Sequence, residues 1–152
     1  GSDTYGVTQQ VVKYLEDVTY NVTINLGPCH HYSTSFFSRL PSHFQVRHSV
    51  NCLIEEMSRH DFAITGGGLT PFEAIASGMP CLVIATESFE IAVGKALESM
   101  GCASYLGHYS QLSPQAFTQS LDIASMSHRC LQSIDTHGTQ RVLDSVLSIT
   151  RS

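Results

Sequence analysis

The feature that most constrains the fold of this chain is an alternation of short apolar segments with amphipathic segments of helical period. The apolar, β-branched segments cover residues 20–26, 44–46, 62–65, 81–85 and 103–106. Between them, apolar residues recur every three or four positions, as on one face of a helix. Strands that alternate with helices in this way predict an α/β fold with a parallel sheet covered by helices on both faces.

The segments between the strands predict the covering helices. The first spans residues 7–18, and Thr4 or Asp3 is expected to cap it. Further helices are expected over residues 33–40, 50–57, 71–77 and 89–100. The tail is expected to be helical from Ser113, because Ser113-Pro114 supplies an N-cap followed by a first-turn proline.

The start of the chain departs from the usual pattern of such folds. A doubly wound domain normally begins with a strand, whereas this chain enters a helix almost directly. We therefore expect a Rossmann-like doubly wound parallel sheet that lacks its first strand. The 152 residues suit one compact domain, so residues 1–152 are expected to form a single domain.

Composition excludes several classes of partner. The formal charge is -5 and no basic run occurs, so no nucleic-acid partner is expected. The longest apolar stretches have about five residues, and we expect no membrane span and no signal peptide. Five widely spaced cysteines without a C-x-x-C pair indicate reduced thiols in a cytoplasmic protein. Of these, Cys81 and Cys102 are expected in the core.

The segment from Asp61 to Ala74 carries the strongest functional signal. A buried strand runs through Gly66, Gly67 and Gly68 into a helix. A helix N-terminus leaves N–H groups unpaired and carries about half a positive charge, while glycines allow a phosphate close to the backbone. We therefore predict that a diphosphate binds on this turn, which continues through Leu69 and Thr70.

Glu73 stands about one turn into the same helix. Its carboxylate is placed to accept hydrogen bonds from the hydroxyls of a ribose whose phosphates lie on the turn. The alternative is that Glu73 only complements the helix dipole, a role worth about 0.3 to 1 kcal/mol. For the glycines the alternative is a tight turn that binds nothing, since neither the Walker pattern nor G-x-G-x-x-G is present.

Together these residues resemble a known family. Gly66-Gly67-Gly68-Leu69-Thr70-Pro71-Phe72-Glu73-Ala74, then Ala76-Ser77-Gly78-Met79-Pro80 and a buried strand, resembles the C-terminal domain of GT-B glycosyltransferases. The nearest likeness is to the UDP-sugar hydrolase of pseudaminic acid biosynthesis, and the peptidoglycan N-acetylglucosaminyltransferase is a more distant one. Gly1-Ser2-Asp3 resembles the end of that family's glycine-rich loop, and residues 90–97, 106–107 and 135–141 also fit.

The resemblance implies roles for further residues. The segment Val46-Arg47-His48-Ser49 would lie beside the base, which the backbone reads in such folds, leaving Arg47 as a solvated charge. Ser88 and Phe89 stand where the relatives carry an Asn-Gln pair that touches the sugar or phosphates. Losing two amide side chains removes hydrogen bonds worth about 0.5 to 1.5 kcal/mol each.

The resemblance implies that residues 1–152 are a fragment of a larger two-domain enzyme, a glycosyltransferase or UDP-sugar hydrolase. Their implied function is to bind its nucleotide-sugar donor, a UDP-sugar. The essential histidine of the hydrolase relatives lies in an N-terminal domain, the expected partner, so no catalytic residue is assigned here. The isolated chain is expected to be inactive, and no cofactor is expected. Alternatives are a UDP-sugar 2-epimerase-like domain and a regulatory or interaction module that has kept the fold and lost donor binding.

Two further clusters predict no site. Cys29-His30-His31 lacks a nearby carboxylate, and the chain has no H-E-x-x-H, so no metal is expected. Glu55 and Glu56 are expected on the solvent face of an amphipathic helix.

Overall fold

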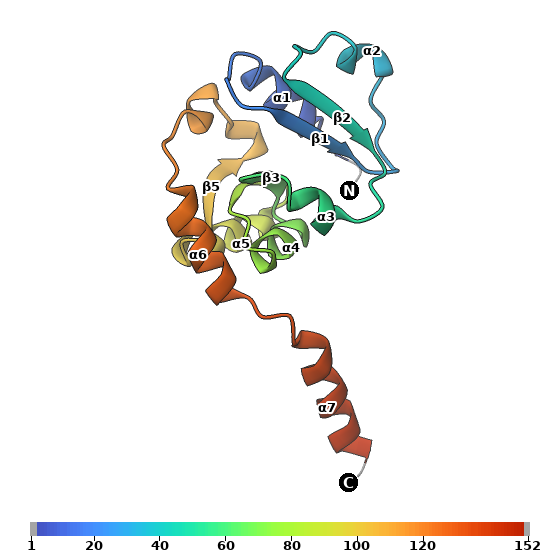
Figure 1. Ribbon diagram of the computed structural model, residues 1–152, viewed down its shortest axis with the longest axis vertical. Coiled ribbons are helices and arrows are strands. Elements are labelled where there is room, and N and C mark those ends of the chain that lie inside the picture. The colour runs from blue at the N-terminus through green and yellow to red at the C-terminus, as the bar shows by residue number, and fades with distance from the viewer. Residues whose placement is uncertain (1–2, 151–152) are drawn as a thin grey trace.

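A computed structural model describes residues 3–150, which form an α/β fold with parallel strands (Figure 1). Gly1 and Ser2, which carry part of the resemblance, lie outside the described residues. All the predicted strands are confirmed, although β2 and β5 each run two residues further than expected. The strands are β1 (Val22–Leu26), β2 (Phe44–His48), β3 (Ala63–Gly66), β4 (Cys81–Ala85) and β5 (Ala103–His108).

Helices lie between the strands as predicted, and two more follow the last strand, but several begin or end at other residues than expected. They are α1 (Val7–Tyr14), α2 (Thr34–Phe37), α3 (Leu53–Met57), α4 (Thr70–Ala76), α5 (Ser88–Ser99), α6 (Ile123–Ser133) and α7 (Gly138–Thr150). The prediction that the first helix reaches Val18 is wrong. Val18 packs in the same apolar cluster as α1 but lies just after a turn at residues 15–17, so the apolar spacing is satisfied without a helix. The third helix begins at Leu53 rather than at residue 50.

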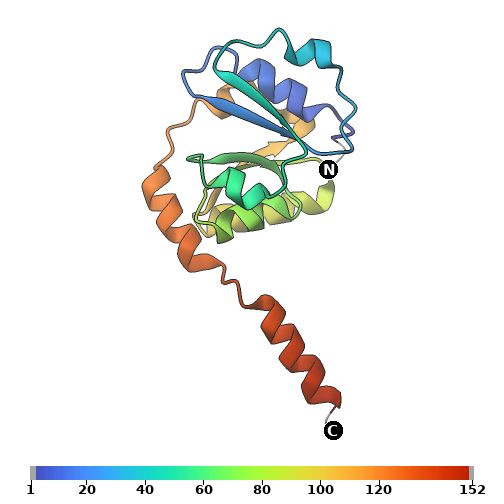
Figure 2. The same cartoon turned by 45° about the vertical axis from the view of Figure 1, so that its right-hand side comes forward.

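The tail differs from a continuous helix. Ser113-Pro114 opens only a short 3-10 helix, Pro114–Phe117, whose Phe117 is buried. The first α-helix of the tail is α6, where the side chain of Asp122 accepts a hydrogen bond from the Ser125 amide. After a break, α7 extends away from the rest of the molecule in both views (Figure 2). No helix within residues 3–150 is both long and apolar enough to cross a membrane.

The first amides of α1 are bonded by the side chain of Asp3, one of the two residues expected to cap the helix, although the N-cap position itself is Gly6. The Asp3 carboxylate accepts hydrogen bonds from the amides of Val7 and Thr8 at 2.9 and 2.8 Å. It also accepts one from the hydroxyl of Tyr32, which follows β1. Asp3 has a φ of 46°, a left-handed conformation that aspartate tolerates better than most residues. The contact with Tyr32 places this loop beside the carboxyl end of β1.

The strands form two parallel groups. β1 pairs with β2 from Val22↔Phe44, while β3 pairs with β4 from Ala63↔Cys81 and β4 with β5 from Cys81↔Ala103. Figures 1 and 2 show the β1–β2 pair above the sheet of β3, β4 and β5. The α/β class and the Rossmann-like parallel arrangement are thus confirmed.

The core lies on both faces of β4, which is buried along its whole length. One cluster joins Val83 to Met57, Ile75 and Leu97 from α3, α4 and α5. On the other face, Leu82 and Ile84 pack against Val7 and Val11 of α1 and against Leu15, which follows the helix. Cys81 and Cys102 are buried as predicted. Burial raises the pKa of the Cys81 thiol to about 12, so it remains protonated and acts as a packing residue.

Gly94 lets α5 approach β5 closely. A Cβ at this position would lie 2.4 Å from Cδ2 of Tyr105. We therefore expect Gly94→Ala to destabilise the fold by about 1 to 3 kcal/mol, because overpacking outweighs the gain of about 0.5 to 1 kcal/mol in helix propensity. Urea unfolding measures the change. In a Tyr105→Ala background the same substitution should be neutral or stabilising, and a stabilising Gly94→Ala in the natural chain would contradict the packing.

Candidate functional site

The glycine turn connects the carboxyl end of β3 to α4. Gly66 and Gly68 are exposed, whereas Gly67 is buried, and none of the three has a positive φ. The turn itself therefore does not need glycine for its backbone conformation. A Cβ on Gly67 would lie 2.6 Å from Cβ of Glu90, so a glycine is required there by the close approach of α5.

Glu90 holds the inner side of this turn. Its carboxylate accepts hydrogen bonds from the amide and hydroxyl of Thr86, at 2.7 and 2.9 Å, and from the amide of Glu87, at 3.2 Å. Burial by itself raises the pKa of Glu90, but hydrogen bonds from Thr86, Glu87 and the Gly67 amide outweigh it and bring the pKa below its usual range. An ionised carboxylate thus links the loop after β4 to the glycine turn.

Glu90 was not predicted as a site residue. The signal that could have found it is the spacing of Glu87 and Glu90, which form a capping box at the start of α5. The sequence analysis assigned Gly67 to phosphate binding alone. The structure gives it a packing role as well.

The outer side of the turn presents unpaired donors. Within residues 3–150, the amides of Gly68, Leu69 and Thr70 donate to no protein acceptor. Leu69 is 81% exposed. These amides open α4, where the helix dipole favours an anion.

Glu73 lies in the first turn of α4 and is exposed. Among the described residues its carboxylate makes no hydrogen bond and no ion pair, while its backbone carbonyl accepts a hydrogen bond from the hydroxyl of Ser77. Glu73 is therefore not drawn inward into a salt bridge. Its role in holding a ribose remains a prediction.

Ser88 shares this edge of the sheet with the glycine turn. Gly66 pairs in register with Ile84, so the loop after β3 and the loop after β4 are neighbours. Ser88 begins α5 and is exposed, and the ring of Phe89 beside it is 66% exposed. The structure thus brings together Ser88 and all the predicted residues of the turn.

An aromatic contact that the sequence analysis missed borders this edge. The hydroxyl of Tyr5 donates a hydrogen bond to Glu87 at 3.1 Å, and its ring stacks on Tyr109 with centroids 4.5 Å apart. The hydrogen bond and the negative charge of Glu87 raise the pKa of Tyr5. No sequence signal marks this group, because its members lie in loops far apart along the chain.

Arg47 and His48 lie elsewhere, at the end of β2. They border a hollow of about 270 Å³, which is lined by Arg47, His48, Ser49, Val50, Asn51, Cys52, Glu55, Glu56 and Arg59. The ring of His48 lies 5.3 Å from that of His30, which follows β1. No hydrogen bond or ion pair between described residues joins this group to the glycine turn.

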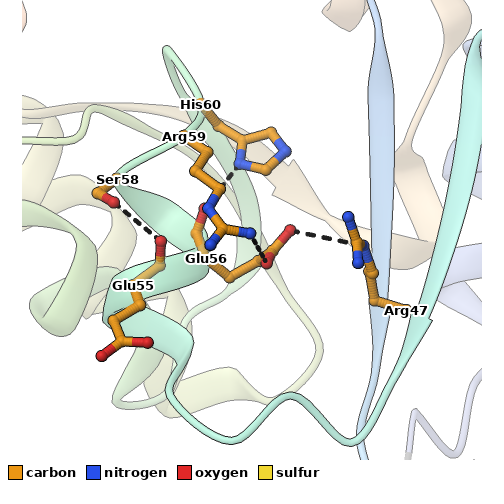
Figure 3. A network of polar contacts seen from close by, with 6 residues as sticks. All are labelled: Arg47, Glu55, Glu56, Ser58, Arg59 and His60. Carbon is orange, nitrogen blue, oxygen red and sulfur yellow. Dashed lines mark hydrogen bonds and ion pairs between the residues drawn. The ribbon is translucent and has the colours of Figure 1, made fainter.

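Two predictions about this hollow need correction. Glu56 is not on the solvent face of its helix, since its side chain is only 10% exposed. It lies between two guanidinium groups, with its carboxylate 3.9 Å from Nε of Arg47 and 3.5 Å from Nη1 of Arg59 (Figure 3). Arg47 is thus half-exposed and paired rather than simply solvated, while Glu55 is exposed as predicted.

The described residues contain no group of three His, Cys, Asp or Glu side chains placed to hold a metal ion. His30 instead stacks on Tyr32 with ring centroids 6.2 Å apart.

Comparison with known proteins gives one partial relative by sequence. No family model matches the chain. The spore coat polysaccharide biosynthesis protein SpsG of Bacillus subtilis (strain 168) is 33% identical over 64 residues, which is 42% of this chain and 19% of that protein. The match is too short to show membership of a family.

Solved structures match over most of the chain. The glycotransferase of kitacinnamycin superimposes with a TM-score of 0.74 and 16% identity, over 96% of this chain and 39% of that one. The glycosyltransferase SnogD from Streptomyces nogalater matches with a TM-score of 0.61 and 22% identity, over 80% of this chain and 32% of that one. The chain thus spans about two fifths or less of these proteins, and it has the Rossmann-like fold of GT-B glycosyltransferases.

The lowered pKa of Glu90 predicts a pH dependence of stability. The stabilisation is present above the usual glutamate pKa of about 4.3 and is lost as the pH falls below it. Urea unfolding between pH 3 and 7 should therefore show Glu90→Gln to be less stable by a constant amount above about pH 5, with the difference shrinking toward pH 3. Glu16→Gln, at an exposed position, serves as the control. A difference that does not vary with pH would contradict the assignment.

Proposed function

We propose that this domain binds a nucleotide-sugar donor, a UDP-sugar, for a glycosyltransferase or nucleotide-sugar hydrolase. One observation carries the proposal. A single strand, turn and helix present the unpaired amides of Gly68, Leu69 and Thr70 and, one turn later, the unpaired carboxylate of Glu73. Donors for a diphosphate are thus followed by an acceptor for a ribose.

The diphosphate would lie on the outer side of the turn. Glu90 already satisfies the inner side, so its negative charge fixes the turn without occupying the amides of Gly68 to Thr70. Hydrogen bonds to a charged group contribute about 1.5 to 3 kcal/mol each. The turn is held before the ligand arrives, so little free energy is spent in ordering it.

The base would lie in the hollow beside Arg47 and His48. The residues that line it include Glu56, which pairs with both Arg47 and Arg59. As the resemblance implies, the backbone of the segment Val46-Arg47-His48-Ser49 would read the edge of the base, except for the Ser49 amide, which donates to the Leu26 carbonyl. Like the turn, this hollow follows the carboxyl end of a strand, the side on which open α/β sheets bind ligands.

The reaction would need a second domain. The matched glycosyltransferases are much longer than this chain, which covers 39% and 32% of them. We assign donor binding to this domain and the catalytic histidine to an N-terminal domain of the same enzyme, as the resemblance implies. Transfer or hydrolysis of the sugar would then occur between the two.

A second candidate is an interaction module that has lost donor binding. The exposed ring of Phe89 favours it, because it stands beside Ser88 where the relatives carry two amides. An apolar ring there cannot replace their hydrogen bonds to a sugar or phosphate.

Calorimetry with UDP, CDP and GDP tests the first proposal. We expect UDP to bind, and Glu73→Ala to weaken binding about tenfold or more, since hydrogen bonds to a charged acceptor are lost. Glu16 is exposed and lies two residues after the end of α1, so Glu16→Ala should leave the affinity unchanged. A folded chain that gives no heat with any of the three at millimolar concentration would favour the interaction module.

The isolated chain is expected not to turn over a UDP-sugar, because it would hold the donor without the catalytic histidine. Release of free sugar or UDP is measured by chromatography, with Glu73→Ala as the control for contaminating enzymes. Turnover by the natural sequence that the substitution abolishes would place the catalytic groups within this chain.

A further inference from the structure

Two carboxylates stand beside the glycine turn. A Cβ on Gly68 would lie 3.8 Å from a carboxyl oxygen of Glu90, so this charge lies directly under the turn. Glu87 stands three residues earlier, at the exposed start of α5. Within residues 3–150 neither side chain forms an ion pair. Both carry negative charge at neutral pH, and they oppose an anion on the turn unless other groups hold them away from it.

The two carboxylates differ in how firmly they are held. Glu90 is buried and accepts hydrogen bonds from the amide and hydroxyl of Thr86 and from two further amides. Glu87 is exposed, and its carboxylate accepts from the Glu90 amide within the capping box. Among the described residues, Tyr5 is its only partner outside this helix start, with 3.1 Å between the two oxygens. The position of the Glu87 charge therefore depends on the Tyr5 hydroxyl.

The ring of Tyr5 is held by its surroundings. It stacks on Tyr109 with centroids 4.5 Å apart, and Tyr109 packs against the apolar cluster that covers β4 on the α1 side. The backbone of Tyr5 lies in a turn that the Gly6 amide closes by donating to the Asp3 carbonyl at 3.1 Å. The hydroxyl is thus presented to Glu87 by contacts that need no ligand.

The order of the strands gives the direction of this hydrogen bond. β4 lies between β3 and β5. The glycine turn follows β3, Glu87 follows β4 and Tyr109 follows β5. Because Tyr5 lies against Tyr109, its hydroxyl draws the Glu87 carboxylate toward β5 and away from the turn. The turn is one strand spacing of about 4.8 Å away, within the range of about 8 Å over which charges act at physiological salt.

We propose that Tyr5 is a positioning residue for the diphosphate of the donor: its hydroxyl holds the Glu87 carboxylate on the β5 side of the sheet, so that this charge does not oppose the anion. The inference rests on the proposed binding of a diphosphate to the glycine turn. Tyr5 does not touch the ligand and acts through Glu87. The loop before α1 thereby tunes donor affinity from the far side of β4.

Removal of the Tyr5 hydroxyl tests the proposal. Tyr5→Phe keeps the ring and its stacking, and we expect it to weaken binding of UDP and of inorganic pyrophosphate about threefold to tenfold at about 0.05 M salt. Calorimetry measures both affinities. Tyr20→Phe is the matched control, because Tyr20 is also half-exposed but precedes β1 at the opposite ends of the strands. It should leave both affinities unchanged.

Two conditions separate repulsion by Glu87 from a merely structural effect. Glu87→Gln keeps an acceptor for the same hydrogen bonds and removes the charge, so Tyr5→Phe should have no effect on either affinity in that background. In about 1 M salt, charges act over only about 3 Å, so Tyr5→Phe and the natural chain should bind equally. A weakening that persists in either condition would overturn the proposal, and so would unchanged binding of Tyr5→Phe at low salt.

A measurement without ligand separates the role of Tyr5 from donor binding. Hydroxide catalyses the exchange of exposed amides and a nearby carboxylate repels it, so Tyr5→Phe should slow exchange at Gly68 and Leu69 about twofold or more, as measured by NMR. Addition of Glu87→Gln should restore the rates. If neither probe binds the natural chain at millimolar concentration, the proposed donor binding is wrong, whereas the exchange rates still show whether Tyr5 controls the charge at the turn. Exchange that does not change in Tyr5→Phe would overturn the role assigned to Tyr5.

Discussion

The burial of β4 between two layers of side chains is the constraint on which the rest of the structure depends. All its residues are buried, with α4 and α5 on one face and α1 on the other. Pairing with β4 places β3 and β5 in parallel, so that the loops after all three strands meet at one edge. Packing of apolar surface thus decides where polar groups gather.

Glu90 links this core to the candidate site. Glu90 belongs to α5, and its carboxylate accepts hydrogen bonds from the amides of Thr86 and Glu87 beside the glycine turn. A buried carboxylate is costly unless its hydrogen bonds are satisfied, and here satisfying them orders two loops at once. A helix of the core thus supplies the carboxylate that joins the two loops of the candidate site.

The general outline of the molecule could be predicted from the sequence. The order of strands and helices follows from the spacing of apolar residues. The glycine turn and Glu73 follow from the three glycines that separate a strand from a helix in one segment. The ends of the helices were predicted less accurately. The turn at residues 15–17 before Val18 and the 3-10 helix at Pro114 satisfy the same apolar pattern as a longer helix. The spacing of apolar residues predicts which side chains are buried more accurately than it predicts the hydrogen bonding of the backbone between them.

The sequence by itself determined the α/β class, the parallel order of elements and the location of the glycine turn, because these depend on local periodicity and on glycine. Only the tertiary structure decided that Glu56 is buried between Arg47 and Arg59, that Glu90 lies under Gly67 and that Tyr5 reaches Glu87. It also decided that the strands form two groups. These features depend on contacts between segments distant along the chain, whose geometry is set by packing and not by any local pattern.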